Sequence, residues 1–401
     1  MQILSNIETE SNVPELNYIY IDTDTSMEAL KEHIKDSGSI AIDTEADSLY
    51  HYYHKVCLIQ ITLGGQNYIV DPLSDMDLSG FLKLLEKKPL ILHDAGYDLR
   101  MMQSSFNFSA KGKVFDTMAA AQLLGHEKFG LGSLVKKYFG IEMPKGGQKS
   151  NWSKRPLSKK QLEYASEDTF YLHKLADIFS EELEKLGRME WHDEWSLRTV
   201  KAVEKHKETV EEEDENAWRI KGARHLHRNA LTHLKQIWKW RERESQKQDV
   251  PPFKVMQNSR MLKLAVWAST SPHESIKSGP KLPSNCKGRR LQELKKALAI
   301  AYNTPKAEKP RHPKVKHRPK PPSESFLVFE ELKIECDKLA ADLGVASNVI
   351  APRGKLKSIS IQRPKNITEI MKYGDLMKWQ AKLLEPAVRH LLSKYPEAEA
   401  T

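Results

Sequence analysis

Short apolar runs bounded by turn residues fill the first half of the chain, alternating with stretches of helical spacing. The predicted strands are 18–21, 39–44, 56–63, 66–70 and 89–93. The predicted helices lie near 95–105, 116–124, 131–139 and 159–185. Gly64-Gly65, between two strands, is a two-residue hairpin signal. A sheet with both a hairpin and helical crossovers is mixed, so the predicted class is α/β.

From residue 217 onward the apolar spacing is helical only. An acidic run at 211–215 and a segment rich in Pro, Lys and Arg at 304–323 interrupt the pattern, and such compositions favour linkers. The predicted organisation is an α/β domain over 1–210, a basic helical domain over 217–303, a linker over 304–323 and a second helical domain over 324–395. A length of 401 residues fits two or three domains at roughly 150 residues each.

Charge is strongly segregated along the chain. Residues 1–180 carry 19 Lys and Arg against 24 Asp and Glu, whereas residues 217–323 carry 26 against 6. A basic block joined to an acidic one is typical of a nucleic-acid protein whose acidic part performs chemistry. The alternative is a basic surface that is merely solvated. Residues 324–401 are nearly neutral, with 12 against 11.

Cysteine usage and the N-terminus bear on location. The three cysteines are scattered, which argues against a disulfide framework or a zinc site. The first residues have neither a basic region nor an apolar stretch, and long apolar runs are absent. We therefore expect a cytoplasmic protein that does not enter a membrane.

Four acidic residues of the first domain occupy positions where surface charge is unexpected. Asp43 and Glu45 end an apolar strand, and because strand side chains alternate, both point to one face. Asp98 lies about one turn into the next predicted helix, at the carboxyl edge of the sheet, where active sites of α/β proteins collect. Tyr164 and Asp168 are four residues apart on a helix opened by a capping-box pattern at Ser158, so they share a face.

Carboxylates gathered in one cleft raise each other's pKa unless a cation compensates them. Oxygen-only ligands favour Mg²⁺ or Mn²⁺ over zinc. Four carboxylates suit two ions about 3.5–4 Å apart, which serve in-line phosphoryl displacement. The phenol of Tyr164 then has the task of holding the attacking water. An ordinary turn or helix cap would explain any one of these residues alone, but not their ordered combination.

The same residues carry a family resemblance. Ile42-Asp43-Thr44-Glu45, His93-Asp94-Ala95-Gly96-Tyr97-Asp98-Leu99 and Tyr164-Ala165-Ser166-Glu167-Asp168 resemble the three motifs of the DEDDy 3′–5′ exonucleases. The run from Trp152 through Ser158 into Tyr164 looks like the ribonuclease D branch of that family. The resemblance implies a ribonuclease-H-like fold, two divalent metal ions held by Asp43, Glu45, Asp98 and Asp168, and a water positioned by Tyr164. Asp94 is an additional acid that we interpret as a solvated neighbour.

Further residues of this domain are predicted to contact substrate. Lys145 and Arg155 offer phosphate partners around Trp152, whose ring could stack on a base or equally belong to the core. Thr44 stands between two metal ligands and could touch the terminal nucleotide. His93 also belongs to this set, although a buried, hydrogen-bonded histidine is the favoured interpretation over a catalytic base.

The basic helical block resembles a second known module. Leu234 through Glu242, followed by Asp249 through Met256, is similar to the helicase-and-RNase-D C-terminal (HRDC) domain, which binds nucleic acid. We expect Trp218, Trp238, Trp240 and Trp267 to be core aromatics. The predicted phosphate contacts are Arg289, Arg290, Lys295 and Lys296. Residues 324–395 look like a second, divergent HRDC-like domain, with Trp379 and Leu383 among its apolar positions, serving either RNA binding or a scaffold.

The leading functional prediction is a 3′–5′ exoribonuclease that releases nucleoside 5′-monophosphates, with tRNA precursors as the substrate that the resemblance implies. We expect a monomer without a nucleotide cofactor. Two alternatives stay open: a DNA 3′–5′ exonuclease, because only contacts to the 2′-hydroxyl separate the two, and a catalytically inactive nucleic-acid-binding scaffold. A helicase is excluded, because the sequence has no Gly-x-x-x-x-Gly-Lys-Ser/Thr phosphate loop.

Overall fold

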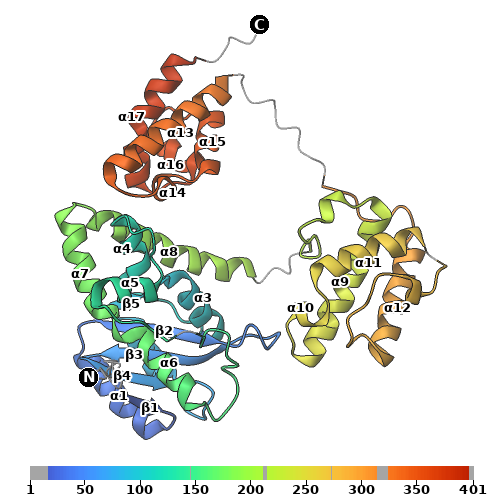
Figure 1. The fold of residues 1–401 in the computed structure, drawn as a ribbon, viewed down its shortest axis with the longest axis horizontal. Helices are drawn as coiled ribbons and strands as arrows, with labels where there is room; N and C mark the ends of the chain where they lie inside the picture. Colours follow the sequence, from blue (N-terminus) through green and yellow to red (C-terminus); the bar gives the residue numbers. More distant parts are fainter. Residues whose placement is uncertain (1–16, 145, 211–214, 272, 314–323, 397–401) are drawn as a thin grey trace, which may run out of the picture. The chain divides into compact units, whose positions relative to one another are not determined.

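The computed structural model describes residues 17–144, 146–210, 215–271, 273–313 and 324–396 (Figure 1). The chain divides into two compact units. The first joins Met1–Glu45, Val56–Lys207 and Lys320–Thr401, and the second joins Ala46–Lys55 to Glu208–Pro319. Among the described residues, no helix has the length and apolar character needed to cross a membrane.

The first unit is built on a six-stranded sheet in the order β1-β4-β3-β2-β5-β6. The strands are β1 (Tyr18–Ile21), β2 (Ile40–Ala46), β3 (Val56–Leu63), β4 (Gln66–Val70), β5 (Leu90–Leu92) and β6 (Val114–Asp116). β4 runs antiparallel to β3 and parallel to β1, and β5 is parallel to both β2 and β6. The prediction of a mixed sheet in an α/β domain is confirmed.

The β3–β4 hairpin forms where the two apolar runs around Gly64-Gly65 predict it. Leu63 pairs with Gln66 across the two-residue turn, and Gly64 and Gly65 have φ of 55° and 79°, which glycine adopts without strain. All eight residues of β3 are buried, so both faces of the sheet are covered there. The core of the unit therefore lies on both sides of its central strands.

Eight helices accompany the sheet in the described part of the chain up to residue 210. They are α1 (Asp24–Asp36), α2 (Ser79–Leu85), α3 (Ala95–Phe106), α4 (Thr117–Leu123), α5 (Leu131–Phe139), α6 (Lys159–Phe170), α7 (Leu172–Lys185) and α8 (Met189–Val210). The helix predicted over 159–185 is divided at Tyr171, so that α6 packs on β3 and β4 while α7 packs on β5 and α4.

The described residues of the second unit from 217 onward are helical, as predicted. Its α-helices are α9 (Arg228–Gln248), α10 (Pro252–Val255), α11 (Asn258–Thr270) and α12 (Gly288–Asn303), with 3-10 turns at Ala223–His225 and Ile276–Ser278. Trp218 and Trp240 are buried in its core, and Trp238 and Trp267 pack against that core partly buried. The prediction of core aromatics is confirmed for Trp218 and Trp240.

The C-terminal residues of the first unit form a further helical region. Its helices are α13 (Glu324–Leu343), α14 (Ser347–Ile350), α15 (Arg353–Gln362), α16 (Ile367–Gly374) and α17 (Lys378–Lys394). Leu332, Leu356 and Leu384 belong to its own core. Trp379 and Leu383 instead join the cluster built by α4, α5 and α7. The residues predicted as linker at 314–323 lie outside the described residues.

Candidate active site

Three of the four predicted carboxylates meet at the sheet. Asp43 and Glu45 alternate along β2, so their side chains leave the same face. Asp168 reaches them from α6, and one carboxylate oxygen from each of the three residues lies within 4.8 Å of the other two. These side chains are close enough to share a metal ion, which is the arrangement that the metal-site prediction requires.

The fourth carboxylate, Asp98, lies beside this group and is turned toward β2. It stands in the first turn of α3 and is 4% exposed. Its Oδ1 accepts hydrogen bonds from the Oγ1 of Thr44 at 2.6 Å and from the Thr44 backbone N–H at 3.1 Å. Thr44 was expected to touch the terminal nucleotide, but its hydroxyl is occupied by Asp98 and its side chain is buried. We therefore assign Thr44 to holding Asp98 in place.

Burial and mutual repulsion disfavour ionisation of these four residues. Burial raises the pKa of Glu45 to about 10, and the charges of Asp43, Asp168 and Asp98 contribute to that rise. Burial is also the largest cause of the raised pKa values of Asp43, Asp98 and Asp168, the last reaching about 7. The neighbouring charges that act on all four come from other carboxylates. A divalent cation would reverse this balance, and an all-oxygen donor set suits Mg²⁺ or Mn²⁺.

Tyr164 stands one turn before Asp168 on α6. The helix begins with a capping box, in which Ser158 and Gln161 satisfy each other's backbone N–H groups. Burial raises the pKa of the Tyr164 phenol above its usual range, and the charges of Asp168 and Glu45 add to this. The phenol therefore keeps its proton and can donate a hydrogen bond beside the carboxylates.

Two predicted substrate contacts prove to be structural. Trp152 is 0% exposed, so its ring is part of the core and unavailable to a base. The guanidinium of Arg155 binds Asp71 through two hydrogen bonds of 2.6 Å and also donates to the backbone oxygens of Cys57 and Trp152. Its donors are already engaged, and the phosphate role predicted for it is wrong.

His93 and Lys145 have different outcomes. The Nδ1 of His93 lies 2.9 Å from the Oγ1 of Thr117, and burial lowers the pKa of His93 to about 4. Both observations support the interpretation of a hydrogen-bonded, neutral histidine and leave no charged ring for substrate. Lys145 lies outside the described residues.

One structural carboxylate near the site escapes the sequence patterns used above. Asp116 caps α4 by accepting from the N–H groups of Met118 and Ala119, and it also accepts from those of Asp94 and Ala95, at 2.9 to 3.2 Å. One buried carboxylate thus ties together the starts of α3 and α4. An acid immediately before a predicted helix is a recognisable N-cap signal, but its second partner, α3, is a tertiary contact.

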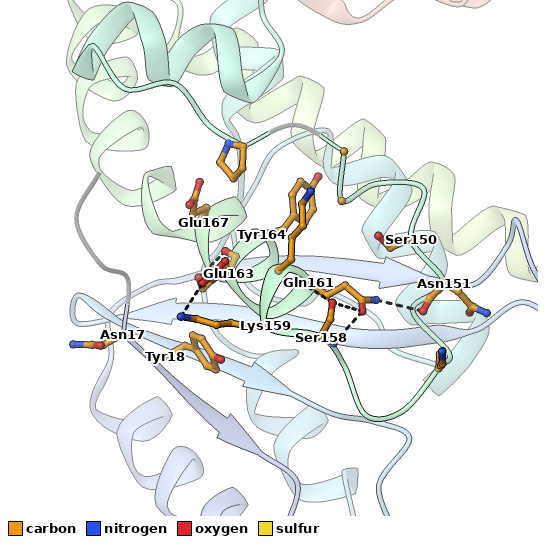
Figure 2. A pocket seen from close by; sticks show the side chains of 16 residues that line it. Asn17, Tyr18, Ser150, Asn151, Ser158, Lys159, Gln161, Glu163, Tyr164 and Glu167 are labelled. Carbon is orange, nitrogen blue, oxygen red and sulfur yellow. Dashed lines mark hydrogen bonds and ion pairs between the residues drawn. The ribbon is translucent and has the colours of Figure 1, made fainter. Parts of the chain in front are cut away.

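A cavity of about 1120 Å³ borders Tyr164 (Figure 2). Lys154, Lys159 and Lys160 line it together with polar residues, among them Gln161, whose amide contacts the backbone oxygen of Asn151. At its edge Gly147 packs closely on the Tyr164 ring. A Cβ at this position would lie 2.2 Å from the ring's Cγ. Only glycine fits at this position without moving the phenol.

The basic residues predicted on α12 divide into two groups. Arg289 is paired with Glu244 through two hydrogen bonds of 3.0 and 2.9 Å, and Arg290 lies 3.5 Å from the same carboxylate. These two arginines compensate a buried acid, and their assignment as phosphate contacts stays a prediction. Lys295 and Lys296 are exposed, although Lys296 forms an ion pair with Glu293 on its own helix.

Known families match both parts of this architecture. A family model described as 3′-5′ exonuclease matches residues 18–184, and a model of the HRDC domain matches residues 230–275. The exonuclease match contains all four carboxylates and Tyr164. The HRDC match lies within the second unit.

Relatives that match more than two thirds of the chain decide the family. The ribonuclease D of Zymomonas mobilis subsp. mobilis is 30% identical over 286 residues, which cover 68% of this chain and 70% of the relative. The chain belongs to the ribonuclease D family. It is a 3′–5′ exoribonuclease. The ribonuclease D of Sphingobium indicum is 29% identical over 79% of this chain and 81% of its own length.

A solved structure shares the fold of this ribonuclease D family member. The chain resembles Escherichia coli RNase D with a TM-score of 0.66 and 23% identity, and the likeness covers 95% of this chain and 100% of that one. For an exonuclease of this family, the acidic group on β2 and α6 fits a divalent metal ion. The carboxylate group on β2 and α6 can therefore support the exoribonuclease activity of the family.

Proposed function

We propose that this enzyme hydrolyses RNA with two divalent ions, Mg²⁺ or Mn²⁺, held by Asp43, Glu45, Asp98 and Asp168, and releases nucleoside 5′-monophosphates. The observation that carries the proposal is the group of carboxylate oxygens within 4.8 Å, with Asp98 fixed beside it. Ions bound at such a donor set activate water and neutralise charge on the leaving oxygen.

The chain's own residues supply position and one proton donor. β2 holds Asp43 and Glu45 on a hydrogen-bonded strand, and Thr44 holds Asp98 through two hydrogen bonds. The protonated phenol of Tyr164 donates to the attacking water and fixes its direction of approach. Gly147 leaves room for the Tyr164 ring in that position.

The proposed substrate is the 3′ end of RNA, with tRNA precursors as the class. Relatives that cover most of the chain carry the name ribonuclease D, and E. coli RNase D is described as an exoribonuclease involved in structured RNA processing. These names favour RNA over the DNA alternative. The complete set of carboxylates and Tyr164 favours an active enzyme over an inactive scaffold.

The helical parts have separate proposed roles. The basic domain at 217–303 binds RNA through exposed lysines such as Lys295, supported by its charge of 19 Lys and Arg against 5 acids. The region at 324–395 is a second, divergent HRDC-like domain with a scaffolding role. Its near-neutral charge and the packing of Trp379 against the catalytic unit support that role. We propose that the enzyme acts as a monomer.

The metal assignment is tested with Asp43→Ala and a matched control, Asp94→Ala, which removes an exposed acid from the second motif. Asp43→Ala should lower the turnover rate at least 10³-fold and weaken Mg²⁺ binding measured by calorimetry, because a ligand is lost. Asp94→Ala should retain both properties. Cleavage by Asp43→Ala at a rate near that of the wild type would contradict the two-metal proposal.

The substrate is tested by comparing a 3′-extended tRNA with a single-stranded DNA of matched sequence. RNA should be shortened from its 3′ end in Mg²⁺ without ATP, and a chelator should stop the reaction. Faster degradation of the DNA would favour the DNA exonuclease alternative.

A further inference from the structure

A short aromatic segment of the second unit is held in a defined conformation. Ala46–Lys55 belongs to this unit. Asp47 closes the base of the segment by accepting from the backbone N–H and the Nζ of Lys55 at 2.8 and 2.7 Å. At its tip, Asp249 at the end of α9 accepts from the N–H groups of Tyr52 and Tyr53 at 3.0 and 3.1 Å. The backbone that presents these tyrosines is therefore fixed by hydrogen bonds.

Two exposed rings belong to the residues that bind Asp249 or follow it in the sequence. Tyr53 is 63% exposed, and Phe253 on α10, four residues after Asp249, is 50% exposed. The ring of Tyr52 packs edge-on against that of Tyr53 with 5.1 Å between centroids. Single exposed apolar side chains are ordinary, but ordered aromatic rings on a braced segment present flat faces at little further entropy cost.

Positive charge accompanies the rings. The Nζ of Lys254 lies 4.4 Å from the centroid of the Tyr50 ring, which brings a cation into the aromatic group. Residues 217–323 carry 26 Lys and Arg against 6 acids. Exposed aromatic faces in a basic setting are the surface that single-stranded nucleic acids prefer, because every base has a face that can stack and every phosphate is an anion.

We propose that Tyr53 and Phe253 form a stacking platform for unpaired bases of single-stranded RNA, with Lys254 beside it to pair with a phosphate. This inference rests on the proposed RNA substrate. The charge of the unit favours a polyanion over an apolar protein segment as the occupant.

Binding of a single-stranded RNA that carries 2-aminopurine tests the platform with the full-length chain in a chelator, so that the RNA stays intact. Stacking quenches the fluorescence of this base. Tyr53→Ala and Phe253→Ala should each weaken binding about tenfold and reduce the quenching, whereas Tyr53→Phe should retain both properties. The matched control is Phe326→Ala, which removes a ring that is 66% exposed on α13 of the other unit and should change neither.

Salt dependence distinguishes stacking from a charge contact. Because stacking releases no counterions, the slope of log K against log salt should be the same for Tyr53→Ala and the wild type. A double variant, Tyr53→Ala with Phe253→Ala, that binds within twofold of the wild type would overturn the proposal. Equal weakening by Tyr53→Phe would also overturn it, because that variant keeps the ring. Hydrolysis of a dinucleotide, measured separately with Mg²⁺, reports on the proposed function alone.

Discussion

The phenol hydroxyl of Tyr164 can be removed without changing the packing of its ring. Tyr164→Phe keeps the contact with Gly147 and the tilted packing on Trp152, where the centroids are 6.1 Å apart. If the hydroxyl orients the water, the rate should fall about 10²-fold or more with little change in KM. If Tyr164 only packs, activity should stay unchanged and stability should fall by at most about 1–2 kcal/mol.

Single-turnover cleavage of a short labelled RNA at saturating Mg²⁺ measures this rate without interference from product release. Thermal unfolding of Tyr164→Phe provides the control for packing. A rate within about threefold of the wild type would remove the tyrosine from the mechanism and leave the orientation of the water to the metal site.

His93 gives the fold a predictable sensitivity to acid. Burial lowers the pKa of His93 from 6.5 to about 4, so the unfolded chain takes up the proton first as the pH falls. Above about pH 6.5 the titration of His93 does not lower the free energy of unfolding. From there down to about pH 4 the free energy of unfolding falls progressively. At roughly 1.4 kcal/mol per pKa unit, the loss should approach about 3 kcal/mol.

The comparison that isolates this effect is His93→Asn, which can still hydrogen bond to Thr117 but does not titrate in this range. Urea unfolding of both proteins at pH 7.5, 6, 5 and 4 gives their difference in free energy of unfolding. That difference should shift in favour of His93→Asn as the pH falls. A difference independent of pH would show that His93 is not buried as a neutral ring.

Among the elements, those with strong local signals were predictable. The β3–β4 hairpin follows from two apolar runs around Gly64-Gly65, and the start of α6 follows from the capping box at Ser158. β6 has three residues and α8 follows α7 closely, so neither was predicted. The same division holds in the site: β2 alternation predicts the pairing of Asp43 with Glu45, whereas the engagement of Arg155 by Asp71 joins distant parts of the sequence.

Asp116 makes such a contact between distant parts of the sequence, because its carboxylate binds the starts of both α3 and α4. Asp116→Asn keeps the size of the side chain but loses the charge and one acceptor, so the N–H groups at the starts of α3 and α4 would be left under-satisfied. We expect a loss of about 2–3 kcal/mol in the free energy of unfolding. Turnover should also fall, because the first turn of α3 carries Asp98.

The matched control is Asp77→Asn, at an exposed acid that accepts from Ser79 in the first turn of α2. It should lower the free energy of unfolding much less than Asp116→Asn does, and turnover should be unchanged. Chemical unfolding and steady-state kinetics of the two variants make the comparison. Equal effects of both substitutions would show that Asp116 is no more than an ordinary helix cap.

At the scale of the whole molecule, the C-terminal helices belong physically to the catalytic unit. Trp379 stacks on Trp191 with 4.6 Å between ring centroids and 6° between planes. Arg188 donates from one guanidinium to the backbone oxygens of Leu123 and Leu343, both at 2.6 Å. A chain truncated before these helices would expose this packing, so RNA binding by the basic block must be tested in the full chain.

Exposed lysines of the second unit should account for the salt dependence of RNA binding. Replacing Lys295 and Lys263 with Gln removes positive charge without removing helix-forming residues. If both lysines neutralise phosphates of a single strand, the slope of log K against log salt should become less steep by roughly 0.7 per contact, and affinity should fall across all sequences. Neither lysine belongs to the catalytic site, so cleavage of a dinucleotide should stay unchanged.

The matched control is Lys357→Gln with Lys382→Gln, in the nearly neutral C-terminal region. Equal numbers of charges are removed in both cases, so a general effect of net charge would appear equally in the two double variants. Binding is measured in a chelator between about 50 and 200 mM salt, where phosphate contacts have a large effect on affinity. Identical slopes in all three proteins would mean that these lysines do not face RNA and that the basic surface is merely solvated.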